Sequence, residues 1–171
     1  MVWSKLRQKV RGFITPELRR RLDIHCTCYH DAHDDYGEVW ITLDGKKIFG
    51  GGYYRWYIKE YSPEILSDFS IIHGFHKDFY NVNIESQTVE QVMKSGIHDT
   101  SHITRNLELY LNTSFEDCLK SNNPIYKAFS IIDKRLGKRK FSELVIGENE
   151  HPLVKMFYNL RKEVFEKSIQ Y

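Results

Sequence analysis

The sequence predicts an α+β fold in which an N-terminal helix and a small antiparallel β-meander pack against a C-terminal helical bundle. The main observation is a change in the spacing of apolar residues, which is helical at 3–14, has a period of two at 23–49 and is helical again beyond residue 84. The chain has 171 residues, 41% of them apolar, which is enough for one hydrophobic core. We therefore expect a single α+β domain over 1–171, with a helix-plus-sheet subregion at 1–61 and a mainly helical subregion at 62–171.

Composition and charge argue against several classes of protein. No run approaches the roughly 18 apolar residues that a membrane span needs, the N-terminus lacks a signal-peptide pattern, and three cysteines do not indicate a disulfide framework. A cytoplasmic protein that does not enter a membrane is expected. The net charge is only +2, but residues 1–22 carry seven basic side chains against Glu17, a local charge of +6. This segment is either a contact for nucleic acid or a membrane surface, or a helix that covers the sheet with its charges in water, which is the favoured interpretation.

The N-terminal elements follow from side-chain spacing and turn residues. Helical spacing from Trp3 to Ile14 predicts a helix that Pro16 ends. From Asp23 the period is two, so we expect a strand whose alternate side chains point to opposite faces. Asp44-Gly45 is a strong signal for a two-residue hairpin that joins the second and third strands.

The rest of the chain is predicted to be mainly helical. Three glycines at 50–52 predict a flexible joint, and 53–61 is assigned to a fourth strand, with a helix as a close alternative. Residues 62–84 are left unassigned. Capping residues then predict helices at 88–96, at 101–111, from Ser114, from Asn123-Pro124 to Gly137, and from His151-Pro152 to the end.

The last of these helices has two apolar stripes. A second stripe of Val154, Tyr158, Phe165 and Ile169 lies beside the main one, so the helix must contact two neighbours. Both neighbours can lie within the chain, or one can be another subunit. The second alternative predicts self-association, with a homodimer as its simplest form.

The residues most able to bind a metal lie after the first strand. Cys26, Cys28 and His30 would share a strand face, and His33 in the following turn could complete a zinc site. A metal-dependent hydrolase using the turn from His25 to Asp35 is the corresponding enzyme hypothesis. The favoured interpretation is core cysteines followed by a polar turn, because free cysteine is usually buried and this spacing is not a common zinc motif.

A possible binding face combines aromatic and basic residues. If 53–61 is a strand, Tyr53, Arg55 and Tyr57 share one side, beside His25, Tyr29 and Trp40 of the meander. Aromatic and cationic side chains suit both base stacking and protein interfaces. Alternatively, helices cover this face. A second basic cluster, of Lys134, Arg135, Lys138, Arg139 and Lys140, suits either an acidic partner or a solvated surface near a helix C-terminus.

Several segments carry a family resemblance. They are Trp3-Ser4-Lys5-Leu6, Ile24-His25-Cys26-Thr27, Val39-Trp40-Ile41-Thr42-Leu43-Asp44-Gly45-Lys46, Asn123-Pro124-Ile125, Asp133-Lys134-Arg135-Leu136-Gly137-Lys138-Arg139, His151-Pro152-Leu153-Val154 and Leu160-Arg161. With these segments the chain resembles a family of small uncharacterised bacterial proteins. The resemblance implies one intact domain and carries over no catalytic residue, and small proteins of this kind suggest toxin immunity or another regulatory partner role.

The leading hypothesis is a non-catalytic protein that binds a macromolecule, most specifically a protein partner. No nucleophile elbow, Walker loop, zincin motif or dinucleotide fingerprint is present, so no cofactor is predicted and the chain is not expected to be an enzyme. The alternatives are the metal-dependent hydrolase and a nucleic-acid-binding protein that uses the face with Tyr53 to Tyr61.

Overall fold

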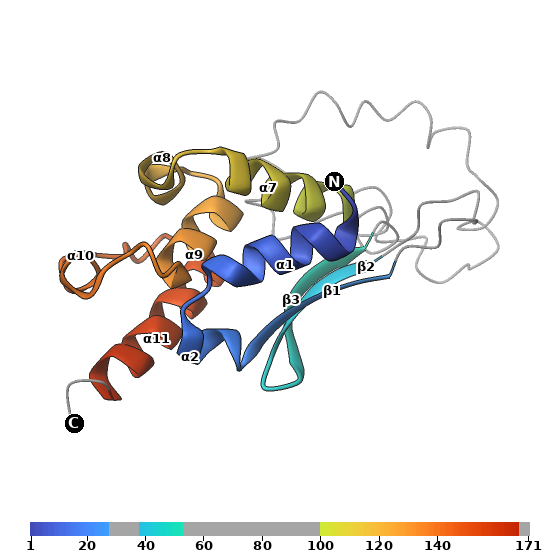
Figure 1. Cartoon of the computed structure of the whole chain (residues 1–171). Helices are drawn as coiled ribbons and strands as arrows, with labels where there is room; N and C mark the ends of the chain where they lie inside the picture. The colour runs from blue at the N-terminus through green and yellow to red at the C-terminus, as the bar shows by residue number, and fades with distance from the viewer. Residues whose placement is uncertain (28–37, 53–99, 168–171) are drawn as a thin grey trace, which may run out of the picture.

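The computed structural model describes residues 1–27, 38–52 and 100–167 (Figure 1). Its N-terminal elements are α1 (Trp3–Phe13), α2 (Pro16–Arg19), β1 (Leu22–Thr27), β2 (Glu38–Leu43) and β3 (Lys46–Gly52). The later elements are α7 (Thr100–Asn112), α8 (Phe115–Lys120), α9 (Pro124–Ile132), α10 (Lys138–Ser142) and α11 (Pro152–Lys167). The predicted α+β class, with an N-terminal helix and meander before a helical half, is confirmed. The helix predicted at 88–96 and the segments 53–61 and 62–84 lie outside the described residues.

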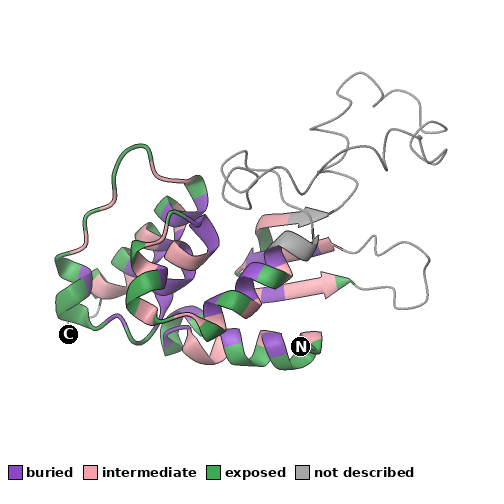
Figure 2. Cartoon of the chain, turned by 90° about the horizontal axis from the view of Figure 1, so that it is seen from above, coloured by how far each residue is buried: buried purple, intermediate pink, exposed green. Residues whose placement is uncertain are grey.

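One hydrophobic core joins the sheet and the helices. Helix α1 buries Leu6 and Val10, and together with α7 it packs against the sheet. On the other side of the molecule α9 is the central helix, in contact with α7, α8 and α11. Figure 2 shows the buried residues concentrated where these helices face one another and the sheet. Along the described ranges, no helix combines the length and the apolarity of a membrane span.

The sheet has the order β1-β2-β3 and is antiparallel, as predicted. In its register Ile24 pairs with Ile41, and His25 pairs with Trp40. Ile24 and Ile41 are buried on the inner face, so the alternation places His25 and Trp40 on the outer face. The turn residues Asp44 and Gly45 both have positive φ, at 49° and 80°, which is the type I′ geometry that Asp-Gly favours.

The glycines at 50–52 form the end of a strand, and the prediction of a flexible joint is wrong. Gly50, Gly51 and Gly52 pair with Trp40, Val39 and Glu38. A Cβ atom on Gly50 would lie 2.6 Å from the carbonyl oxygen of Val39 and 2.7 Å from Cβ of Trp40. Glycine at this position therefore permits a close approach of two backbones beside an irregularity in the register.

Helix α9 begins as predicted and ends earlier. The Asn123 side chain accepts hydrogen bonds from the N–H groups of Ile125 and Tyr126, so it is the N-cap. The helix stops at Ile132, and the predicted end at Gly137 is wrong, since Asp133 is extended and forms a β-bridge with Ile14. Gly137 instead precedes α10, a short helix that helical spacing alone did not predict.

The second apolar stripe of α11 contacts neighbours within the chain. Val154 is completely buried, so the prediction of a subunit contact is wrong for this residue. Tyr158 and Phe165 pack on Phe141 of α10, with ring centroids 5.4 and 5.6 Å apart. Ile169 lies outside the described residues. The intramolecular alternative therefore accounts for the three described members of the stripe.

Candidate functional site

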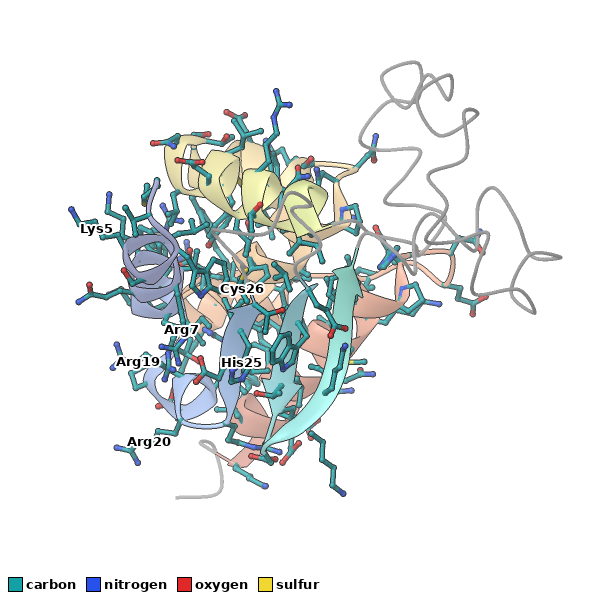
Figure 3. All side chains as sticks on the ribbon, turned by 90° about the vertical axis from the view of Figure 1, so that its right-hand side faces the viewer. Lys5, Arg7, Arg19, Arg20, His25 and Cys26 are labelled. Atoms are coloured by element: carbon teal, nitrogen blue, oxygen red, sulfur yellow. The ribbon has the colours of Figure 1, made fainter. Side chains whose placement is uncertain are left out.

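The outer face of the sheet carries a hollow whose wall includes two of the predicted binding residues. His25 projects from this face in Figure 3, with Arg19 and Arg20 beside the β1 edge. The hollow has a volume of about 520 Å³, and we call it the outer hollow. Its lining residues are Arg11, Arg20, Arg21, Leu22, Asp23, His25, Trp40, Thr42, Asp44 and Gly45. They come from α1, from the two residues that follow α2, from β1 and β2, and from the turn between β2 and β3.

The centre of the outer hollow is a stacked pair of rings. His25 and Trp40 are cross-strand partners, and their rings are 14° from parallel with centroids 5.2 Å apart. Nε2 of His25 is 2.9 Å from the hydroxyl of Thr42, a hydrogen bond whose direction depends on the tautomer. On the β3 side, the Lys47 ammonium lies 5.7 Å from the centroid of the Trp40 ring. Trp40 therefore lies between two side chains of its own sheet, because β2 is the central strand.

The β1 edge of the hollow is closed by a carboxylate and two arginines. Arg7 binds both carboxylate oxygens of Asp23 at 2.5 and 3.1 Å, and Arg11 pairs with the same carboxylate at 2.7 Å. The free backbone groups of Ile24 are also satisfied, since its N–H donates to Asp23 at 2.7 Å and its carbonyl accepts from Arg7 at 2.8 Å. These side-chain hydrogen bonds occupy the backbone groups of the β1 edge at Ile24. They therefore block the addition of a further strand there, which an unpaired edge would permit.

These contacts also set the ionisation of Asp23. Partial burial opposes the charged form, but the hydrogen bonds from Arg7 and the Ile24 N–H, with the charge of Arg11, outweigh it and hold the pKa of Asp23 below its ordinary value. The carboxylate is therefore ionised at neutral pH. Part of the basic charge of the N-terminal segment is neutralised inside the protein, in agreement with the interpretation of α1 as a helix that covers the sheet.

The remaining arginines of the hollow differ in their partners. Arg21 pairs with Asp44 at 2.7 Å and with Glu163 of α11 at 3.4 Å. Its hydrogen bond with Asp44 lowers the pKa of that carboxyl group and raises the pKa of Arg21. Arg19 and Arg20 are exposed and form no ion pair with a carboxylate of the described residues. They are consequently available to an anionic group brought by a ligand or partner.

Of the other predicted site residues, the structure describes only Cys26. Tyr29, Tyr53, Arg55 and Tyr57 lie outside the described residues, so their place beside Trp40 stays a prediction. Of the possible metal ligands, only Cys26 is described, and it packs against the hydrophobic core on the face opposite His25. Cys28, His30 and His33 belong to the segment that is not described. Within the described ranges, no three His, Cys, Asp or Glu side chains are grouped so that they could hold a metal.

The second basic cluster is interrupted by structural ion pairs. Arg135 binds the buried Asp133 at 2.7 Å, and its guanidinium lies 4.1 Å from the Phe13 ring centroid. Lys140 pairs with Glu116 at 2.7 Å. Lys138 opens α10, so its predicted place near a helix C-terminus is wrong. This cluster is therefore a less uniform site for an anionic partner than the sequence indicates.

The sequence predicts the two rings of the hollow, but not its polar wall, which consists of Asp23, Thr42 and Arg20. Asp23 and Thr42 share the outer face with the rings, and the period of two in each strand is a signal for that. Their position opposite each other depends on the register of β1 with β2, and ten residues separate these two strands along the chain. From the sequence, Arg20 is only one of the basic residues of the segment 1–22. Its place at the hollow follows from the packing of α2 against β1.

Comparison with known proteins gives a family and no further relative. No curated protein matches the chain, and no solved structure matches it. The model of the SF0329 protein family, however, matches residues 2–162, a span that includes every residue of the outer hollow. Because the match extends over nearly the whole chain, this protein belongs to the SF0329 protein family.

Proposed function

We propose that this chain is a non-catalytic protein that binds a protein partner through the outer hollow, in a regulatory or immunity-like role. The observation that carries the proposal is the half-buried Trp40–His25 stack, surrounded by ion-paired and unpaired arginines. Tryptophan and arginine dominate the energetics of protein interfaces, where an aromatic centre is typically enclosed by a polar rim. The mixed charges of the rim suit a protein surface, which also carries both signs.

Two features of the face weigh against nucleic acid as its ligand. Trp40 lies between His25 and Lys47, so a base would have to displace one of them before it could stack. Arg21 and Lys47 are also paired with Asp44 and Glu38, so these two cations present little net charge to a phosphate backbone. Nucleic-acid binding accordingly stays the weaker alternative.

The chemistry of the hollow also favours binding over catalysis. His25 and Thr42 are close enough to act as a base and a hydroxyl group, but Thr42 is only 9% exposed. None of the described carboxylates orients the His25 ring, and Asp23 is held by two arginines instead. The second candidate, a metal-dependent hydrolase, would use His30, His33 and the aspartates at 31–35. Elemental analysis of the purified protein tests it.

A comparison of captured proteins tests the proposal. Immobilised wild-type chain, Trp40→Ala, His25→Ala and the control Val145→Ala are incubated with extract of the source cells, and bound proteins are identified by mass spectrometry. Val145 is 87% exposed and absent from the hollow, so its variant should retain the same partner as the wild type. We expect Trp40→Ala and His25→Ala to lose that partner while keeping the wild-type circular dichroism spectrum.

Three other results would contradict the proposal. A partner retained by both folded hollow variants would show that binding occurs elsewhere. Captured material released by nuclease treatment, with no protein that depends on Trp40, would favour the nucleic-acid alternative. A stoichiometric metal ion in protein purified without added metal would favour the hydrolase.

A further inference from the structure

We propose that the segment of the partner that occupies the outer hollow is acidic, with carboxylates that pair with Arg19 and Arg20 beside an apolar residue on Trp40. This inference rests on the proposed function and specifies the chemistry of the partner.

The cations of the N-terminal segment divide into neutralised and available ones. Arg7 and Arg11 share Asp23, and Arg21 is paired with Asp44 and Glu163. These three arginines therefore present little net charge to a partner. Four exposed basic residues of the same segment have no carboxylate partner among the described residues: Lys5, Lys9, Arg19 and Arg20.

The available cations lie on the side of the hollow next to β1. Figure 3 shows Lys5, Arg19 and Arg20 on this side, projecting outward from α1 and the end of α2. Arg20 also lines the hollow itself. Glu17 is exposed nearby and offsets one of these charges, so the local excess is about three. Such an excess attracts an anionic partner and speeds its association.

A polypeptide with carboxylates fits this surface better than a polyphosphate. The available cations border only one side of the hollow, whereas at its hairpin end Arg21 is already neutralised by Asp44. The centre is aromatic, with the half-buried Trp40 between His25 and Lys47. A segment that combines acidic side chains with an apolar residue can pair with the arginines and also bury the apolar residue on the tryptophan, which a repeating phosphate backbone cannot do.

Fluorescence anisotropy with synthetic probes tests this inference. The probes are a short labelled polyglutamate peptide with a central leucine, the matching polylysine peptide, and a single-stranded oligonucleotide of the same charge as the first. The test variant is Arg19→Glu with Arg20→Glu. The matched control is Lys120→Glu with Arg139→Glu, two exposed cations that form no ion pair with a described carboxylate and lie on α8 and α10, away from the sheet in Figure 1.

We expect the wild-type chain to bind the acidic peptide, with affinity that falls between about 50 and 200 mM salt, and not to bind the basic peptide. The test variant should bind about tenfold more weakly, because two attractive pairs become repulsive. The control should stay within about twofold of the wild type. Because all four positions are exposed, each variant should keep the wild-type melting curve.

Several results would overturn the inference. They are no binding of the acidic peptide, equal loss in test and control variants, or tighter binding of the oligonucleotide that the test variant abolishes. The proposed function fails separately: a partner that Trp40→Ala loses and the arginine variant retains would preserve the hollow as a binding site and exclude an acidic segment. A partner unaffected by both changes would reject the site and the inference together.

Discussion

Replacing Asp133 with alanine tests the polar centre that connects the two halves of the fold. The Asp133 side chain is completely buried and accepts hydrogen bonds from the hydroxyl of Tyr110 and from Nε and Nη2 of Arg135, the last two at 3.0 and 2.7 Å. It also accepts from the backbone N–H of Arg135 at 2.7 Å. Its own backbone forms the bridge with Ile14 and ends α9. The substitution therefore removes four hydrogen bonds at the junction of α1, α7 and α9.

The size of the loss follows from which groups remain without a partner. The Tyr110 hydroxyl is buried with Asp133, and burial is the main reason that the pKa of Tyr110 is raised. An unsatisfied buried donor costs about 1–3 kcal/mol. Breaking a buried ion pair costs about 3–5 kcal/mol, but Arg135 is 35% exposed and can regain water. We therefore expect Asp133→Ala to lower the free energy of unfolding by about 3–4 kcal/mol, a large part of the roughly 5–15 kcal/mol typical of a domain.

Urea denaturation followed by circular dichroism measures this change. Glu148→Ala is the control, since Glu148 is exposed and its side chain forms no ion pair with another described residue, so the loss should stay below about 0.5 kcal/mol. Tyr110→Phe removes only the hydroxyl group and should cost about 1–2 kcal/mol. A loss below about 1 kcal/mol for Asp133→Ala, or one no larger than that of the control, would refute the reasoning from buried hydrogen bonds.

Two further predictions concern the sheet. Gly50→Ala should lower the free energy of unfolding, measured in urea, by about 1–3 kcal/mol, because the new Cβ meets the backbone of β2. The control Gly12→Ala has free space in α1 and should be neutral or stabilising. Equal changes in stability for the two variants would contradict the close approach at β3. Asp23→Asn should lower stability at neutral pH, and its deficit should shrink as the pH falls below the ordinary carboxyl value of 3.8, because a depressed pKa contributes stability that is lost when the wild-type group is protonated. A deficit that grows on acidification, measured by urea titrations across this pH range, would contradict the arginine clamp.

Turns and helix caps were predictable from the sequence where a residue type strongly favours one local conformation. Asp44-Gly45 formed the expected turn, and Asn123 capped α9. The end of α9 was not predictable, because the helical spacing continues through Leu136 while the chain leaves the helix at Asp133. The alternative for Asp133 is a set of long-range hydrogen bonds to Tyr110 and Arg135, and helix propensity contains no information about them.

The candidate site was likewise predictable in part: the sequence indicated which side chains share a face, but not which of them make contact. His25 and Trp40 could be placed on one face from the alternation in each strand, but their contact as a stacked pair depends on register. The polar wall depends on still more distant packing. Asp23, which alternation places beside His25, is held by arginines from α1, and Arg21 meets Glu163 on the last helix.

By itself, the sequence determined the class of the fold, the identity of most helices and strands, and which side chains share a face, because these properties follow from the spacing of neighbouring residues along the chain. Only the tertiary structure decided which cations pair with a described carboxylate, where α9 ends, and that Tyr158 and Phe165 contact α10. Those outcomes depend on partners far away in sequence, whose distances are defined only when the helices pack on the sheet.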